Sequence, residues 1–203
     1  MLDPAILLPF LMFGVLLTVT PGPNNTMALS SGVRVGLPAS MPLVLGISVG
    51  VSLQLVAIGL GLGALFDAYP ASHDVMRIVG ALYLVWLAWR IAASGPISMD
   101  KGGRPPLGFL GGAAFQWINP KAWAITTSAA ATYVPHEDYL RNVAIAALIL
   151  AVIAVPCVTL WAAAGTLLRR VLEEPGRARI FNLTVAALLV ATTIPMLLAI
   201  GRP

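Results

Sequence analysis

Charged residues are scarce in this chain. Asp, Glu, Lys and Arg make up 10% of its 203 residues, whereas an average soluble domain has about 25%. The acidic residues all fall at the ends of apolar segments or between them, which leaves the segments themselves free of carboxylates. They are Asp3, Asp67, Asp74, Asp100, Glu137, Asp138, Glu173 and Glu174. So few charges cannot cover a water-facing globule, and a soluble protein is excluded.

Other absences narrow the class further. Cys157 is the only cysteine, so no intrachain disulfide and no zinc site is expected. No glycine-rich ATP-binding loop is present, which argues against ATP-driven transport by this chain alone. The net charge of +4 comes without a dense basic stripe, so nucleic-acid binding is not expected. The first apolar run has Asp3 in its leader and no small-x-small cleavage site, which predicts a retained helix rather than a signal peptide.

What the chain has in abundance is long apolar runs. Hydrophobic residues make up 59% of it and the mean hydropathy is +0.90, and a run of about 20 residues crosses the bilayer as a helix. We predict an all-α membrane protein, with residues 1–203 forming one transmembrane domain of six helices. The predicted spans are 4–34, 38–66, 75–93, 107–134, 140–168 and 178–200. The first would measure roughly 46 Å as one helix, so it must tilt, break or extend beyond the membrane.

The basic residues predict the orientation. Eight of them follow the odd-numbered spans: Arg34, Arg90, Lys101, Arg104, Arg169, Arg170, Arg177 and Arg179. Three lie on the other side: Arg77, Arg141 and Arg202. Because cytoplasmic loops of membrane proteins are enriched in Lys and Arg, the first set is expected in the cytoplasm. Both termini are then outside a bacterial inner membrane.

The two halves of the chain share a pattern. Prolines interrupt the first span at Thr20-Pro21-Gly22-Pro23 and the fourth at Asn119-Pro120, near the middle of each span. Shifting the first three spans by the 99 residues between Pro21 and Pro120 reproduces the last three approximately. We therefore predict two inverted three-helix repeats, 1–94 and 107–203, the plan of many secondary transporters. The alternative is that the chain contains no repeat, since any six-span protein can be divided into two halves of three spans.

Each break has the composition of a helix start. Thr20-Pro21 and Asn119-Pro120 both provide a capping side chain followed by proline at the first helical position. A helix that starts near mid-membrane exposes N–H groups and a positive dipole end, which attract an anion or water. Non-helical backbone at that depth must be buried in protein or line a cavity.

Lys121 adds a cation at the second break. A charge near mid-membrane is costly, and no acidic residue lies in the predicted middle of a span. The substrate's carboxylate is one expected partner; the alternative is that Lys121 extends to an interface. The predicted substrate-binding residues are Thr20, Pro21, Gly22, Pro23, Asn24, Asn25, Gln116, Asn119, Pro120 and Lys121. For Asn24, Asn25 and Gln116 the alternative is hydrogen bonding between helices.

Several motifs together resemble the LysE/RhtB family of amino-acid exporters. They are Thr20-Pro-Gly-Pro-Asn-Asn25, Gly80-Ala-Leu-Tyr-Leu-Val-Trp-Leu-Ala-Trp-Arg90 and Phe115-Gln-Trp-Ile-Asn-Pro-Lys-Ala-Trp123, followed by Trp161-Ala-Ala-Ala-Gly165 and Arg179-Ile-Phe-Asn182. The resemblance runs from Thr20 to Leu189. It implies export of amino acids or close derivatives from the cytoplasm, driven by the proton gradient. The implied partners are that substrate, protons and the lipid bilayer, with a homo-oligomer left open and no cofactor expected.

Two positions depart from the family's pattern. After Gly50, where many relatives carry an acidic residue, this chain has Val51 and then Gln54; after Asn182, a frequent arginine is replaced by Leu183. The first departure argues against a proton-coupling carboxylate in the second span. It also disfavours a dibasic substrate, so a neutral amino acid is expected.

Other functions fit the sequence less well. A membrane enzyme would need catalytic groups at depth, but His73 and His136 lie in predicted loops and no nucleophile–base spacing is present. Metal export would need ligating side chains within the spans, and none is placed for it. A structural or sensory membrane subunit stays open, although Lys121 near mid-membrane counts against it.

Overall fold

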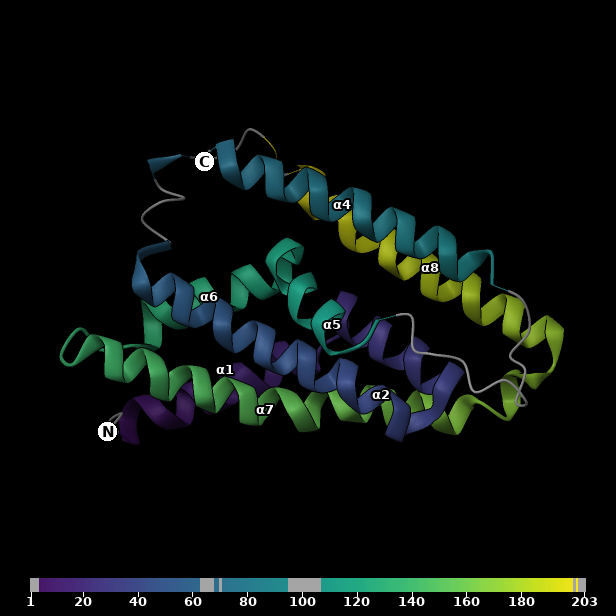
Figure 1. The fold of residues 1–203 in the computed structure, drawn as a ribbon, viewed down its shortest axis with the longest axis horizontal. Coiled ribbons are helices and arrows are strands. Elements are labelled where there is room, and N and C mark those ends of the chain that lie inside the picture. The colour runs from purple at the N-terminus through teal and green to yellow at the C-terminus, as the bar shows by residue number, and fades with distance from the viewer. Residues whose placement is uncertain (1–3, 63–67, 70, 95–106, 199, 201–203) are drawn as a thin grey trace.

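The computed structural model describes residues 4–62, 68–69, 71–94, 107–198 and 200. These residues form helices joined by short turns, with no strand among them. The helices run roughly along one long axis, and the start of the first and the end of the last lie at the same end of it (Figure 1). The two ends of a chain lie on the same side when the chain crosses from one end of the axis to the other an even number of times.

The first broken segment consists of α1 (Pro4–Val19) and the beginning of α2 (Pro23–Ala57). Residues 20–22 separate them without helical structure. The chain reverses within α2 at Gly36, whose φ of 78° lies in the left-handed region that favours glycine. The two arms of α2 therefore correspond to the end of predicted span 4–34 and to most of span 38–66. A short π-helix, η1 (Ile58–Leu62), follows, and residues 63–66 of that span lie outside the described residues.

The predicted helix start at Thr20-Pro21 is wrong in detail. The new helix begins at Pro23, after Gly22, and no side chain caps it. The Thr20 hydroxyl instead donates to the Leu17 carbonyl, 3.0 Å away, and so completes the end of α1. Pro21 precedes an extended glycine, which places the second proline of the Pro-Gly-Pro motif at the first helical position.

The second broken segment matches the prediction. It consists of α5 (Phe109–Phe115), the 3₁₀ turn η2 (Gln116–Ile118) and α6 (Pro120–Tyr133). Asn119 has extended backbone between η2 and α6, and its side-chain oxygen accepts from the Lys121 N–H at 3.1 Å. Asn119 is thus the N-cap of α6 and Pro120 its first residue, as the sequence predicts.

The remaining helices are unbroken and lie close to their predicted spans. They are α4 (Ala71–Ala92), α7 (Tyr139–Leu168) and α8 (Pro175–Leu198), with the 3₁₀ turn η3 (Val171–Glu173) before α8. The predicted spans were 75–93, 140–168 and 178–200. The start of α7 agrees with its prediction to one residue, whereas the charge-based boundaries place the starts of α4 and α8 three or four residues late because their polar first turns belong to the helix.

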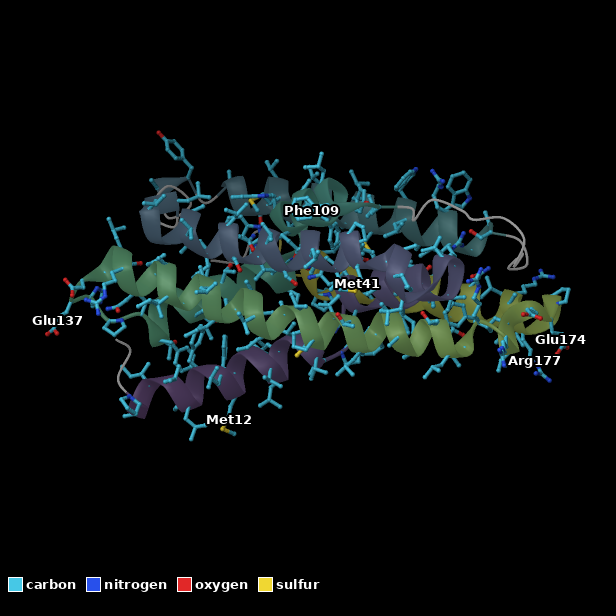
Figure 2. All side chains as sticks on the ribbon, turned by 60° about the horizontal axis from the view of Figure 1, so that its bottom comes forward. Met12, Met41, Phe109, Glu137, Glu174 and Arg177 are labelled. Carbon is cyan, nitrogen blue, oxygen red and sulfur yellow. The ribbon has the colours of Figure 1, made fainter. Side chains whose placement is uncertain are left out.

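Length and hydropathy identify this as an all-α membrane protein. Four described helical segments are long and apolar enough to cross a membrane, namely Pro23–Leu62, Asp74–Ala92, Tyr139–Leu168 and Pro175–Pro195. Pro4–Val19 and Phe109–Ile118 are shorter apolar helices that end at the breaks. Charged Glu137 lies at one end of the molecule and Glu174 and Arg177 at the other, while Met12 projects from its side (Figure 2).

Two helix pairs organise the packing. The long helices α2 and α7 lie against each other, and Gly32 and Gly165 allow this: a Cβ on Gly32 would collide with the Ala162 carbonyl, and one on Gly165 with the Leu29 carbonyl. Helices α4 and α8 form the second pair, which runs alongside the first at a distance (Figure 1). A buried apolar cluster that includes Leu43, Leu84 and Phe115 joins the two pairs.

Candidate functional site

The two breaks meet through Lys121. Its ammonium, from the first turn of α6, donates to the Thr20 carbonyl at 2.7 Å, the Thr20 hydroxyl at 2.8 Å and the Pro21 carbonyl at 3.2 Å. These oxygens belong to the C-terminal end of α1, the negative end of its dipole, where a cation is stabilised. The sequence suggested that Lys121 lacked a partner within the protein; the structure shows that main-chain carbonyls provide one.

The end of α1 is fully accounted for by such bonds. Asn25 donates from its amide to the carbonyls of Thr18 and Thr20, each at 2.7 Å, and the Trp161 indole donates to the Val19 carbonyl at 3.0 Å. A helix end in the membrane has no water to satisfy its carbonyls, which explains this concentration of donors. Asn25 is therefore a structural cap of α1, although its own Oδ1 is buried without a hydrogen-bond partner.

A second link joins the breaks through amides. Asn24 and Gln116 exchange two hydrogen bonds, 2.9 and 3.0 Å long, between their side chains. The Gln116 amide also donates to the Gly112 carbonyl at 2.9 Å, and its oxygen accepts from Asn119 at 3.4 Å. Gln116 is fully buried, so this network fixes the first turn of α2 against the turn that precedes α6.

Gln54 extends the network into the second arm of α2. Its amide nitrogen donates to the Gln116 carbonyl at 3.1 Å, and its oxygen accepts from the Thr126 hydroxyl at 3.4 Å. In the sequence, Gln54 stands out only as a departure from a family pattern. A fully buried amide in an apolar helix was a signal that it has a hydrogen-bonding partner.

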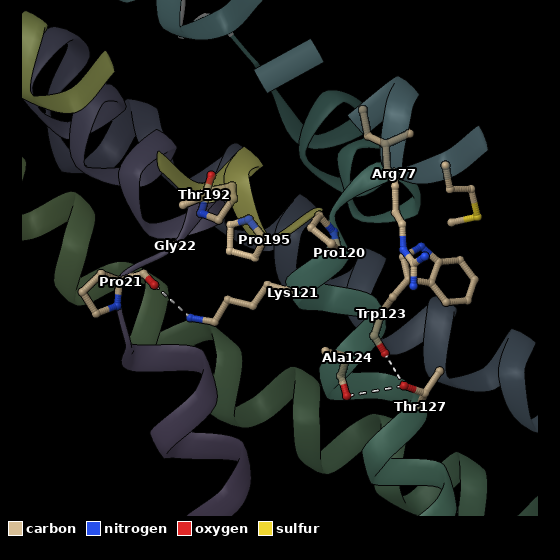
Figure 3. A pocket seen from close by; sticks show the side chains of 13 residues that line it. Pro21, Gly22, Arg77, Pro120, Lys121, Trp123, Ala124, Thr127, Thr192 and Pro195 are labelled. Atoms are coloured by element: carbon tan, nitrogen blue, oxygen red, sulfur yellow. Dashed lines mark hydrogen bonds between the residues drawn. The ribbon is translucent and has the colours of Figure 1, made fainter. Parts of the chain in front are cut away.

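The breaks line a cavity of about 550 Å³. Five of the predicted site residues contribute to its wall: Pro21, Gly22, Pro23, Pro120 and Lys121. Figure 3 shows the Lys121 side chain extending from α6 towards Pro21 across this space. The other five, Thr20, Asn24, Asn25, Gln116 and Asn119, do not line it but form the hydrogen bonds that join the breaks. Asn24 and Asn25 line a smaller hollow that also reaches Gly22 and Lys121.

Helices α4 and α8 close the cavity on its other side. Met76 and Arg77 come from the start of α4, and Thr192 and Pro195 from the last part of α8. Arg77 forms an ion pair with Asp74 at 3.0 Å and lies beside Trp123 in Figure 3. No local pattern in the sequence showed that these ends of α4 and α8 approach the breaks, so these residues were missed.

The wall is mostly apolar with a few polar groups, which is the composition of a small-molecule site. Lys121, Thr127 and Thr192 provide the polar atoms nearest the breaks. Within the part of the chain that the structure describes, no group of His, Cys, Asp and Glu side chains could hold a metal ion. The arrangement is that of a helical membrane protein with a cavity beside two broken helices.

Comparison with known proteins identifies the family. The family model for LysE-type translocators matches residues 15–199. Proteins named "Cysteine/O-acetylserine efflux protein" from Escherichia coli strain K12 and from Shigella sonnei are 34% identical over 192 residues, covering 93% of this chain and 96% of theirs. That from Escherichia coli O139:H28 is 33% identical over the same length. No solved structure matches the chain significantly.

The chain belongs to the LysE-type translocator family. It is a bacterial multi-pass membrane protein and a transporter. The match starts within α1, at residue 15, and continues through both breaks and the cavity.

Proposed function

We propose that this protein exports a small amino acid or a close derivative through the cavity between its broken helices, driven by the proton gradient. The observation that carries the proposal is the placement of Lys121, a cation at the cavity wall that bonds to the carbonyls of the opposite break. Six spans in two inverted three-helix repeats, with both termini outside, complete the proposed topology.

The Lys121 contact suits a zwitterion. If the substrate's carboxylate takes the ammonium of Lys121, the carbonyls of Thr20 and Pro21 are released from it. These carbonyls, at the negative end of α1, then accept from the substrate's own ammonium. The exchange replaces charge-assisted hydrogen bonds with others of the same kind, so neither the Lys121 ammonium nor the carbonyls lose their hydrogen-bond partners while shielded from water.

The helix starts add a second element of recognition. The first turn of α2 has no side-chain cap, and its N-terminal Pro23 lines the cavity beside Lys121. Main-chain N–H groups at such a start favour an anion. Gly22 lets Lys121 approach this turn, because a Cβ at that position would lie 2.9 Å from the Lys121 Cδ.

A neutral substrate fits the charges of the site. The described wall contains no acidic side chain that would hold a second ammonium, and the nearby Asp74 is already paired with Arg77. The names of the relatives specify cysteine and O-acetylserine, each of which has one carboxylate and one ammonium. A small neutral amino acid of this kind is the proposed class for this chain as well.

Transport by the purified protein tests the proposal. Reconstituted in liposomes with an imposed pH gradient, it is expected to move labelled cysteine, O-acetylserine or serine faster than lysine, and to slow when the gradient is collapsed. Faster lysine transport would contradict the neutral preference. Transport rates that do not depend on the pH gradient would contradict the proton coupling. If no amino acid were transported, the proposed export function would be wrong.

A further inference from the structure

The interface between the α4–α8 pair and the rest of the molecule is hollow at both ends. The cavity described above lies at the start of α4, near Arg77. At the opposite end, a second hollow of about 190 Å³ lies between Arg34 of α2, the second half of α4 from Tyr83 to Ile91, and Ser94 and Leu107 beyond it. The buried apolar cluster that contains Leu84 and Phe115 lies in the same interface.

The charges that line the second hollow suit an anion. Arg34 and Arg90 come from different helices and both line it. The Arg90 guanidinium lies 5.2 Å from the centre of the Trp86 ring, a cation–π contact that leaves its N–H groups available at the edge. No acidic side chain is among the described residues of the wall. A carboxylate that bridges the two guanidinium groups would offset their mutual repulsion and accept charge-assisted hydrogen bonds.

One helix face connects this hollow with the breaks. Arg34, Ser30, Met27 and Asn24 recur every three or four residues along the first arm of α2 and so share a face. Ser30 and Met27 line a small hollow that shares Leu87 with the hollow at Arg34. Asn24, at the other end of the face, bonds to Gln116.

We propose that the hollow at Arg34 and Arg90 is the cytoplasmic loading site, where the substrate's carboxylate binds before it moves along this face to Lys121. The inference rests on the proposed function and its orientation, and it adds a second binding site. A lipid phosphate would also suit two arginines, but the connection to the breaks along the α2 face favours the transported solute.

The two ends differ in a way that suits export. Arg77, at the outer cavity, is paired with Asp74 at 3.0 Å. Arg34 and Arg90 form no ion pair with any residue that the structure describes. Because a paired arginine attracts an anion less strongly, Arg77 would compete little for the carboxylate once it leaves Lys121 in the same cavity.

Transport measured separately from each face tests the loading site. Arg90→Gln removes a charge from an exposed side chain, so the protein should still fold. Arg34→Gln removes the second positive charge of the hollow. For labelled cysteine or O-acetylserine, each variant should raise the KM about tenfold from the cytoplasmic face, the effect of one lost charge-assisted hydrogen bond. The KM from the outer face should change less than about twofold, and Arg34→Lys should recover part of the loss.

Arg179→Gln is the matched control, since Arg179 is exposed at the same end of the molecule but outside the hollow; its KM should be unchanged. An equal rise in KM from both faces would overturn the loading site. If Arg34→Gln and Arg90→Gln left the KM unchanged but abolished thermal stabilisation by phosphatidylglycerol, the hollow would be a lipid site, and the loading site would also be overturned. Absence of transport by the unsubstituted protein would instead overturn the proposed function itself.

Discussion

Lys121 illustrates how a charge is kept inside an apolar helical protein. Its three hydrogen bonds go to oxygens at the end of α1, where the helix dipole has already concentrated negative potential. No carboxylate is needed, so the ammonium and the carbonyls can separate to admit a zwitterion without leaving a buried anion behind. In the proposed mechanism the group that holds the two breaks together is also the group that binds the substrate's carboxylate.

Lys121→Met should weaken substrate binding about ten- to a hundredfold, because one charge-assisted hydrogen bond contributes roughly 1.5–3 kcal/mol. The protein should still fold, since Asn25 continues to donate to the Thr20 carbonyl. Equilibrium binding of labelled substrate to the purified protein measures the effect. Arg141→Met, which removes an exposed ion pair with Asp138, should bind normally. Normal binding by Lys121→Met would exclude it from the site.

Gly22→Ala tests the approach of Lys121 to the first break. The added Cβ would lie 2.9 Å from the Lys121 Cδ and 3.2 Å from its Nζ, so the ammonium must shift away from Pro21. We expect the KM to rise about tenfold with little change in melting temperature, because the moving group is the end of a flexible side chain. Gly108→Ala, which meets no atom within 4 Å, is the control; an equal effect there would contradict the explanation.

At the scale of the elements, the two breaks are similar in outline and different in detail. In α6 the start is capped by the Asn119 side chain, whereas the start of α2 has no such cap. Because no side chain caps the start of α2, its first N–H groups would be free to bind an anion in the proposed mechanism. The capped start holds the backbone from which Lys121 extends. One break is thus suited to recognition and the other to positioning.

Asn119→Ala should destabilise the protein by about 0.5–2 kcal/mol, the usual effect of removing an N-cap. It should also impair transport, because the turn that holds Lys121 loses its support. Asn119→Ser restores a capping oxygen but not the contact with Gln116. In thermal unfolding in detergent, the melting temperature of Asn119→Ser should lie between those of Asn119→Ala and the unsubstituted protein. Equal melting temperatures for all three would show that the cap contributes nothing to stability.

On the scale of the whole molecule, the proposed solute path lies between the α4–α8 pair and the helices packed against it. Hollows lie at both ends of their interface, with a buried apolar cluster within it. If the proposed repeats are present, a rocking motion of the α4–α8 pair against the rest would exchange which end is open, as in transporters built from repeats. The described structure has its larger cavity at the end where α4 starts.

Cysteine labelling tests the proposed orientation. In a Cys157→Ser background, a membrane-impermeant thiol reagent should reach Glu174→Cys only from the cytoplasmic side and His136→Cys only from outside. Both positions are exposed and lie in the connections at opposite ends of the molecule. The reverse pattern would invert the topology and place the loading site outside.

Proton coupling without a carboxylate in the middle of a span is a further expectation for the whole molecule. Changing any single Asp or Glu to its amide should leave substantial proton-driven transport, because the described acids lie at helix ends. Asp67, Asp100 and Asp3 lie outside the described residues and belong in the same series. One amide variant that abolishes proton-driven export but retains substrate exchange would identify the coupling acid and contradict this view.

The sequence determined by itself the membrane class, the helices and the location of both breaks. Apolar length and charge placement set the spans, since the hydrocarbon core of a bilayer requires about 20 apolar residues in a helix and disfavours charge. Proline, asparagine and glycine set the breaks, since their effects on the backbone are local. Asn119-Pro120 was predicted in full; Thr20 was assigned the wrong helix end because a hydroxyl can bond forwards or backwards along the chain.

Only the tertiary structure decided what each polar side chain contacts. It brought Lys121 to carbonyls about a hundred residues earlier in the chain and turned Asn25 into a cap of α1. It also placed Gln54 on Gln116 and brought the ends of α4 and α8 to the cavity. Such contacts depend on how helices pack, and packing depends on shape complementarity among many residues rather than on any local pattern.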